Sequence, residues 1–202
     1  LVVPFMPIFV EQLGIEGDQV AFYSGLAISV SAISAAFVSP IWGILADKYG
    51  RKPMMIRAGL AMTITMGGLA FVPNVFWLLF LRFLNGVFTG FVPNATALIA
   101  SQVPKDRSGY ALGTLSTGVV AGTLTGPFVG GFIAEIFGIR NVFLLVGSFL
   151  FLAAILTILF IKENFQPVPK EKALPTKELF TSVKYPFLLI NLFLTSFVIQ
   201  FA

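Results

Sequence analysis

The sequence predicts an all-α membrane protein built from a bundle of bilayer-spanning helices. Hydrophobic residues make up 57% of its 202 residues, charged residues only 11%, and the mean hydropathy is +0.93. A soluble domain carries about 25% charged residues, so too few polar groups remain to cover a water-exposed surface. The apolar residues also form long charge-free runs. These runs reach the length of about 20 residues that a membrane helix needs and lack the alternating pattern of a membrane β-barrel.

The absence of cysteine and histidine limits the chemistry that this chain can perform. The sequence contains no Cys and no His. It therefore has no disulfide framework, no thiol nucleophile and no Cys-ligated metal site, and it lacks the commonest metal ligand and general base. It also has no glycine-rich loop of the type that binds ATP phosphates. We therefore expect no metal, no organic cofactor and no catalytic residues, which argues against an enzyme.

Five full spans are predicted, and incomplete ones at both ends. We expect the full helices near residues 20–46, 53–72, 75–100, 108–134 and 141–161. The apolar segment 1–10 is about half a span, and the apolar segment from Tyr185 continues to the last residue, so we expect helices one and seven to be truncated. The predicted organisation is a transmembrane bundle over 1–161, a linker over 162–185 and the start of helix seven over 186–202.

The basic residues predict which side of the membrane each loop faces. Most of the 13 Lys and Arg residues lie on alternate loops, after the first, third and fifth full spans. By the positive-inside rule these loops are cytoplasmic, in what we expect to be a bacterial plasma membrane. Because topology accounts for the net charge of +4, we expect the lipid bilayer as partner and no nucleic acid.

Arg82 is the one charge that falls deep inside a predicted span, since Arg57, near the start of the span 53–72, counts with the basic loop before it. A charge there costs at least about 2.5–3.5 kcal/mol on insertion scales and normally faces a polar cavity or a partner. Helical spacing places Asn85, Gly86, Thr89 and Pro93 on the face that Arg82 occupies. Alternatively, the chain turns at Arg82 and leaves it at the membrane surface. The better turn chemistry of the Pro-Asn pair that precedes this span favours burial.

A stripe of glycines marks the fourth full span. Gly118, Gly122, Gly126 and Gly130 recur at four-residue intervals, and Pro127 and Gly131 lie beside them. We call this set the glycine stripe. Small residues at this spacing let helix backbones approach closely in lipid, and a proline kinks a helix. The alternative is ordinary helix packing without functional specificity.

A dense charged loop follows the first full span. We call it the loop motif; it comprises Gly43, Asp47, Lys48, Gly50, Arg51 and Lys52. Asp47 and Arg51 are spaced to pair with each other, and Asp106 is a second possible partner for Arg51. Alternatively, the lysines only anchor the chain at the membrane surface. The segment 43–50 is echoed by the segment 131–138, which predicts two three-helix repeats in inverted orientation.

These motifs resemble those of the major facilitator superfamily, over the whole chain. The loop motif resembles its signature loop Gly-x-x-x-Asp-Arg/Lys-x-Gly-Arg-Lys, with every defining position present. Arg82-Phe-Leu-Asn85-Gly86 resembles the helix-four motif Arg-x-x-Gln-Gly, with Asn in place of Gln. The glycine stripe resembles the helix-five antiporter motif of twelve-helix drug:proton antiporters, and Val3-Pro4-Phe5-Met6-Pro7 is similar to the outer part of their helix one. The fold that this implies is the superfamily's N-terminal six-helix bundle.

The resemblance also implies a role for each motif. The loop motif would latch the two halves of the transporter in the outward-facing state. Arg82, with Asn85 and Gly86, would take part in proton coupling, and the glycine stripe would set the direction of transport. Phe5, Phe9, Asn85 and Thr89 are candidates for the wall of the drug cavity.

The expected function is therefore that of a fragment of a proton-coupled multidrug efflux transporter. It would export amphipathic, often cationic, drugs by alternating access, with the proton as coupling ion and with its missing C-terminal half as partner. Arginine does not release its proton in ordinary cycling, so we expect the proton-carrying carboxylate outside this fragment, or at the interfacial Asp47. The main alternative is an uptake carrier of the same superfamily for a dedicated small solute; a channel is a more distant one.

Overall fold

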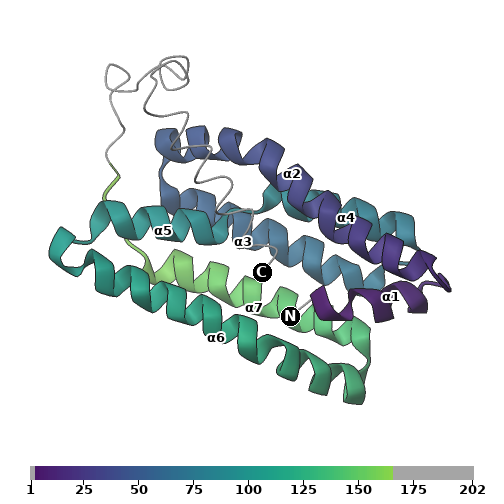
Figure 1. Ribbon diagram of the computed structural model, residues 1–202. Helices are drawn as coiled ribbons and strands as arrows, with labels where there is room; N and C mark the ends of the chain where they lie inside the picture. Colours follow the sequence, from purple (N-terminus) through teal and green to yellow (C-terminus); the bar gives the residue numbers. More distant parts are fainter. Residues whose placement is uncertain (1–2, 166–202) are drawn as a thin grey trace, which may run out of the picture. The chain divides into compact units, whose positions relative to one another are not determined.

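The structure, a computed structural model, describes residues 3–165 as a bundle of helices (Figure 1). The elements are η1 (Val3–Phe5), α1 (Met6–Gln12), α2 (Gln19–Tyr49), α3 (Arg51–Gly68), η2 (Leu69–Phe71), α4 (Val75–Phe88), α5 (Phe91–Gln102), α6 (Lys105–Phe137) and α7 (Ile139–Phe160).

Five helical segments are long and apolar enough to cross a membrane, which confirms the predicted spans. They are Gln19–Tyr49, Arg51–Phe71, Val75–Gln102, Lys105–Phe137 and Ile139–Phe160. Each exceeds the roughly 20 residues that a bilayer requires. The predicted linker, beyond residue 165, and the predicted start of helix seven lie outside the described residues.

Successive spans run in opposite directions, so the turns fall at two ends of the bundle (Figure 1). The turns from α2 to α3 and from α5 to α6 lie at one end, which we call the basic end because it carries the loop motif. The turns from η2 to α4 and from α6 to α7 lie at the other end, which we call the far end. The segment α4–α5 therefore crosses from the far end to the basic end.

The two echoed segments form the same turn at opposite ends. Gly50 ends α2 with φ +100° and Gly138 ends α6 with φ +86°, a left-handed backbone region that glycine enters without steric cost. In each turn the glycine N–H donates to an alanine carbonyl four residues earlier, Ala46 at 2.9 Å and Ala134 at 3.0 Å. The next helix begins at the following residue, so the similarity in sequence is also one of local structure.

The turn before α4 lies at the Pro-Asn pair, which settles the position of Arg82. Asn74 caps α4, and its side-chain oxygen accepts a 3.1 Å hydrogen bond from the backbone N–H of Trp77. This is the bond by which an N-terminal cap satisfies an otherwise unpaired amide. Arg82 therefore lies inside α4, and the alternative that the chain turns at Arg82 is wrong.

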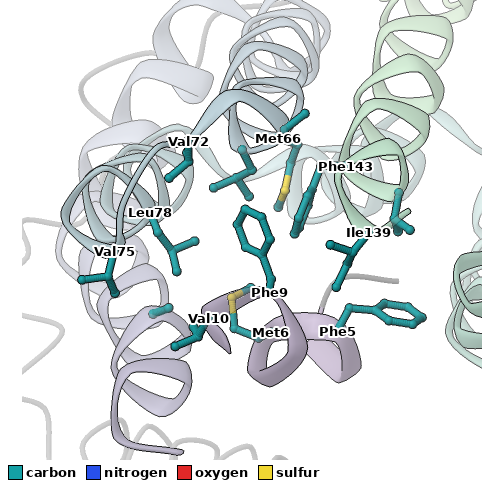
Figure 2. Packing of buried hydrophobic residues seen from close by; sticks show 14 of the residues in the cluster. Phe5, Met6, Phe9, Val10, Met66, Val72, Val75, Leu78, Ile139 and Phe143 are labelled. Atoms are coloured by element: carbon teal, nitrogen blue, oxygen red, sulfur yellow. The ribbon is translucent and has the colours of Figure 1, made fainter. Parts of the chain in front are cut away.

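The main hydrophobic core lies at the far end (Figure 2). It joins α1, the start of α2, the end of α3, the start of α4 and the start of α7. Its buried members are Phe5, Met6, Phe9, Val10, Val20, Ala27, Met66, Leu69, Ala70, Val72, Val75, Leu78, Ile139, Val142 and Phe143. The basic end has a much smaller core of Met55, Ala95 and Leu98.

Phe5 and Phe9 belong to this core, and their predicted place in the wall of a drug cavity stays a prediction. Phe9 is 0% exposed, and its ring lies 4.6 Å from that of Phe143, centroid to centroid. Figure 2 shows both rings directed into the space between α1, α3 and α7. α1 thus packs against α7 through the Phe9–Phe143 pair, and a tilted aromatic pair of this kind stabilises the contact beyond the burial of its area.

Small residues bring the helices together elsewhere in the bundle. α3 packs against α7, α5 and α4, while α2 packs against α4 and α6 against α7. A Cβ added at Gly59 would lie 3.0 Å from that of Ala154, and one added at Gly147 would lie 3.2 Å from Gly67. Because lipid gives helices no hydrophobic drive to associate, such close approach supplies van der Waals contact instead.

The helix predicted over 75–100 is broken in the structure. α4 ends at Phe88 and α5 begins at Phe91, with Gly90 between them at φ +121°. Pro93 then falls in the first turn of α5, where a missing backbone N–H costs least. The sequence prediction assigned Pro93 to a face of one continuous helix and so missed the break.

Candidate functional site

Hydrogen bonds from α2 side chains hold α4 close to α2. Ser31 Oγ donates to the carbonyl of Arg82 at 2.7 Å, and Ser34 Oγ donates to the carbonyl of Phe83 at 3.1 Å. Gly86 lies at the same crossing, and a Cβ there would overlap the Ser31 carbonyl and the Ser34 hydroxyl. The glycine of the helix-four motif therefore permits the approach of two backbones.

Arg82 is buried beside this crossing and has no acidic partner in the part of the chain that the structure describes. It is 5% exposed, its Nη2 lies 4.0 Å from the sulfur of Met6, and its Nε has no hydrogen-bond partner within residues 3–165. The ion pairs among these residues do not include Arg82. Asn85, one turn further along, donates a 3.0 Å hydrogen bond to the hydroxyl of Thr65 on α3. Among the described residues, the site thus combines an arginine that has no carboxylate partner with an asparagine whose amide N–H is hydrogen-bonded.

These residues border a hollow of about 280 Å³, which we call the inner hollow. Its lining comprises Val3, Ile28, Ser31, Ala32, Ala35, Arg82, Asn85, Gly86 and Thr89. Arg82, Asn85 and Gly86 of α4 therefore lie on one hollow together with Thr89, which follows α4, as expected from helical spacing. Pro93, predicted on the same face, does not border this hollow. The part that these residues play in transport stays a prediction.

A second hollow of about 400 Å³ lies towards the basic end, and we call it the outer hollow. Its lining comprises Ala32, Ala35, Ala36, Ser39, Trp42, Gly43, Arg51, Thr89, Gly90, Pro93 and Asn94. Ala32, Ala35 and Thr89 border both hollows. Thr89 and Gly90, between α4 and α5, are therefore part of a wall between the inner hollow, which Arg82 borders, and the outer hollow, which Gly43 and Arg51 of the loop motif border.

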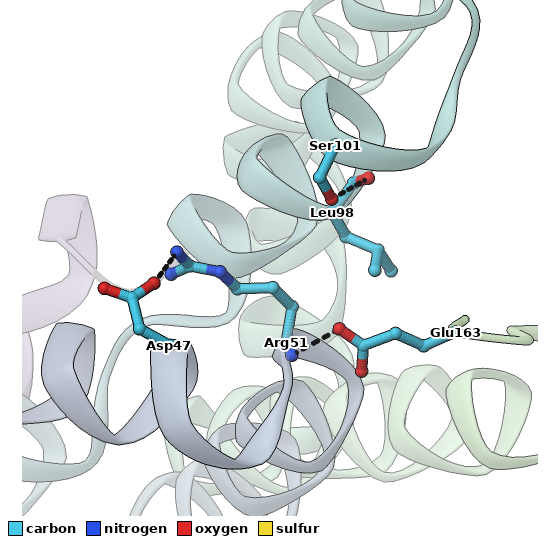
Figure 3. A network of polar contacts seen from close by, with 5 residues as sticks. All are labelled: Asp47, Arg51, Leu98, Ser101 and Glu163. Carbon is cyan, nitrogen blue, oxygen red and sulfur yellow. Dashed lines mark hydrogen bonds and ion pairs between the residues drawn. The ribbon is translucent and has the colours of Figure 1, made fainter. Parts of the chain in front are cut away.

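The loop motif is held by two carboxylates, of which the sequence prediction found one (Figure 3). The guanidinium of Arg51 pairs with Asp47, as predicted. Glu163, which follows α7, accepts hydrogen bonds from the backbone N–H groups of Arg51 at 2.6 Å and Lys52 at 2.8 Å. A carboxylate at this position satisfies unpaired amides and faces the positive end of the α3 dipole.

Further bonds tie the end of α7 and the segment after it to the basic end. Lys52 Nζ donates to the carbonyl of Ile158 at 3.0 Å. With its amide suitably oriented, Gln102 donates to the carbonyl of Lys162 at 3.2 Å and accepts from the N–H of Asn164 at 2.8 Å. The basic end therefore compensates for its small apolar core with polar contacts.

Asp106 does not pair with Arg51, contrary to one of the sequence expectations. Its carboxylate lies 3.8 Å from the guanidinium of the adjacent Arg107, and both side chains are largely exposed. Asp106 belongs to the first turn of α6. There its negative charge interacts favourably with the positive end of the α6 dipole.

The glycine stripe is only partly covered by the residues that the structure describes. Gly126 and Gly130 are the buried residues of α6. A Cβ added at Gly118, Gly122 or Gly131 would meet nothing within 4 Å. α6 continues without a break through Pro127. The close helix contact predicted for the stripe is therefore not made at Gly118 or Gly122 within residues 3–165.

The sequence matches a known family along its whole length. The profile of the Major Facilitator Superfamily matches residues 1–202. The multi-drug resistance efflux pump PmrA of Streptococcus pneumoniae serotype 4 is 87% identical over 202 residues, which are 100% of this chain and 51% of the pump.

More distant relatives match over the same extent. A PmrA homolog from Lactococcus lactis is 56% identical over 200 residues, covering 99% of this chain and 49% of the relative. The multidrug resistance protein MdtG of Salmonella arizonae is 48% identical over 203 residues, covering 100% of this chain and 50% of the relative. The chain thus spans about half the length of the curated relatives that it matches. With its five apolar spans and its matching profile, this multi-pass membrane chain belongs to the Major Facilitator Superfamily.

Proposed function

We propose that this chain is the N-terminal half of a proton-coupled multidrug efflux transporter that works by alternating access. The observation that carries the proposal is the inner hollow, where a buried arginine that has no acidic partner among the described residues borders a space between two membrane spans. An intramembrane charge of this kind is retained for function rather than stability. The names of the relatives supply the substrate class, because two of them are named multi-drug resistance efflux pumps and the third a multidrug resistance protein.

Arg82 is the group through which protons would be coupled to transport. An arginine keeps its own proton at every working pH, so it acts on protons only through a carboxylate that it attracts. Within residues 3–165 the ion pairs give it none. We therefore assign the proton-carrying carboxylate to a part of the protein outside the described residues, where it would approach Arg82 during the cycle.

The other motifs take roles that fit this cycle. The loop motif would latch the two halves, and the glycine stripe would pack against the second half and favour export. Amphipathic, often cationic, drugs would enter a cavity of which Asn85 and Thr89 form part of the wall. The proposal places the basic end in the cytoplasm of a bacterial cell, with residues 162–185 as linker to the second half. It requires no cofactor beyond the proton and no catalytic residue.

The test is dye efflux by the full-length protein. Cells that express it would be loaded with a fluorescent cationic dye, and efflux would be followed with and without a proton uncoupler. We expect the uncoupler to stop efflux, and Arg82→Ala and Pro127→Leu to weaken it. Arg140→Ala is the matched control, because Arg140 caps helix-end carbonyls at the far end without bordering either hollow.

Three results would contradict the proposal or a part of it. Dye retention equal to that of empty-vector cells, across several dyes, would exclude multidrug export and favour a dedicated uptake carrier of the same superfamily. Efflux that persists with the uncoupler would exclude proton coupling. Arg82→Ala protein that reaches the membrane and pumps normally would remove Arg82 from the mechanism.

A further inference from the structure

The break between α4 and α5 leaves backbone carbonyls without their usual helical donors. In a continuous helix the Thr89 carbonyl would accept from the N–H of residue 93, but residue 93 is proline and has no N–H. Gly90, in the left-handed region, breaks the helix, so the carbonyls of Val87 and Phe88 do not receive hydrogen bonds from the N–H groups four residues later. An unpaired carbonyl inside a membrane protein is costly because no water reaches it.

Two side chains from neighbouring helices satisfy these carbonyls. Trp42 of α2 donates through Nε1 to the Val87 carbonyl at 2.7 Å. Arg57 of α3 donates through Nη2 to the Thr89 carbonyl at 3.0 Å and to the Phe88 carbonyl at 3.4 Å. The end of α4 is therefore capped by α2 and α3 rather than by its own chain.

Arg57 and Trp42 also bind each other. The guanidinium carbon of Arg57 lies over the Trp42 ring, 3.4 Å from its centroid, which is a close cation–π contact. The Nε and Nη1 atoms of Arg57 are buried and have no hydrogen-bond partner within residues 3–165. A surface anchor would extend its charge into water, whereas Arg57 directs its charge at the negative end of the α4 dipole.

We infer that Arg57, stacked on Trp42, is a positioning residue that fixes the joint between α4 and α5 and thereby the wall shared by the inner and outer hollows. Thr89 borders both hollows and Gly90 borders the outer one. The carbonyls that Arg57 holds belong to Thr89 and its neighbour Phe88. The position of this wall relative to Arg82 and Arg51 therefore depends on a side chain that lines neither hollow. The inference rests on the proposed function, because it assigns the joint a part in the transport cycle.

The test compares a loss of stability with a loss of transport in the full-length protein. Arg57→Ala is expected to lower both the melting temperature and the efflux rate per folded molecule. The efflux rate should fall about tenfold, the effect of losing a hydrogen bond to a charged group. Arg57→Lys should lower efflux similarly, because an ammonium cannot stack flat and reach two carbonyls at once. Arg140→Ala is the control: Arg140 also donates to two carbonyls, those of Ala70 at 3.3 Å and Val72 at 3.2 Å. It should lower the melting temperature and leave efflux per folded molecule unchanged.

A second substitution separates capping from positioning. Pro93→Ala in the Arg57→Ala background restores an N–H that can donate to the Thr89 carbonyl. We expect this double variant to regain the melting temperature and not the efflux rate, because a continued helix would displace the wall. Recovery of both would show that Arg57 only satisfies carbonyls. Failure to regain the melting temperature, or normal efflux in Arg57→Ala or Arg57→Lys, would equally overturn the inference.

A labelling measurement tests the joint without relying on transport. This chain has no cysteine, so Ser39→Cys places a single probe in the outer hollow once any cysteine elsewhere in the protein is replaced. Arg57→Ala should change the rate of labelling by a membrane-impermeant maleimide several-fold, and Arg140→Ala should not. If the unmodified protein exports no dye, the proposed function is wrong, but the labelling rate still tests whether Arg57 fixes the joint between α4 and α5. Equal labelling rates would overturn the inference.

Discussion

The carboxylate of Glu163 caps the backbone N–H of Arg51 at 2.6 Å, so a residue beyond α7 fixes the start of α3 (Figure 3). The side chain of Arg51 pairs with Asp47 at the end of α2. Gly50 lies between them, and a Cβ at this position would overlap the Glu163 carboxylate. The geometry of the loop motif is thus set partly by a residue that is distant in sequence.

Replacing Glu163 should loosen the loop motif. Glu163→Ala removes both hydrogen bonds to the α3 N-terminus, and loss of such a cap costs about 0.5–2 kcal/mol. We expect a lower melting temperature of the full-length protein and faster trypsin cleavage after Arg51, since the bond after Lys52 leads to Pro53 and resists trypsin. Glu135→Ala is the matched control, because Glu135 is exposed and accepts no side-chain hydrogen bond within residues 3–165. Equal cleavage rates in the two variants would contradict the capping role.

Gly86 should not tolerate even a methyl group. A Cβ there overlaps backbone atoms of Ser31, and backbone cannot move aside as a flexible side chain can. Overpacking costs about 1–3 kcal/mol in well-packed cores, so we expect Gly86→Ala to lower the melting temperature and the yield of folded protein. Gly25→Ala on α2 is the control, because a Cβ there meets nothing within 4 Å. A Gly86→Ala variant as stable as Gly25→Ala would contradict the close crossing of α2 and α4.

Arg82 should be needed for transport although it does not stabilise the fold. Arg82→Met removes a buried cation that has no acidic partner within residues 3–165, while the backbone carbonyl that Ser31 binds remains. Replacing a buried charge by an apolar side chain is often neutral or stabilising. We therefore expect an unchanged or higher melting temperature together with loss of dye efflux. A strongly lowered melting temperature would instead indicate that another part of the protein supplies a carboxylate to Arg82 in its resting state.

The parts of the fold that were predictable from the sequence are those controlled by the bilayer or by local chemistry. Span lengths follow from membrane thickness, and the turns at Gly50 and Asn74 follow from residues whose local preferences are strong. The pairing of Asp47 with Arg51 follows from their spacing of one helical turn.

The parts that were missed depend on contacts between distant segments. The cap on α3 comes from Glu163, and no periodicity links these positions. The break at Gly90 is stabilised by Arg57 and Trp42 from two other helices. The burial of Phe9 against Phe143 depends on which face α1 turns to α7, and an apolar segment of that length does not reveal its face.

The exposed part of the glycine stripe should be needed for transport but should not contribute to the stability of the described bundle. At Gly122 a Cβ meets nothing within 4 Å, and glycine is a poorer helix former than leucine by up to about 1 kcal/mol, so Gly122→Leu should leave the melting temperature unchanged or higher. If the second half packs its backbone closely against α6, as the proposed function requires, the added side chain prevents that approach. Efflux should then fall about tenfold or more, the loss of some 1.4 kcal/mol or more of favourable contact. Gly25→Leu is again the matched control, and efflux that is equal in the two variants would show that this part of α6 faces lipid instead.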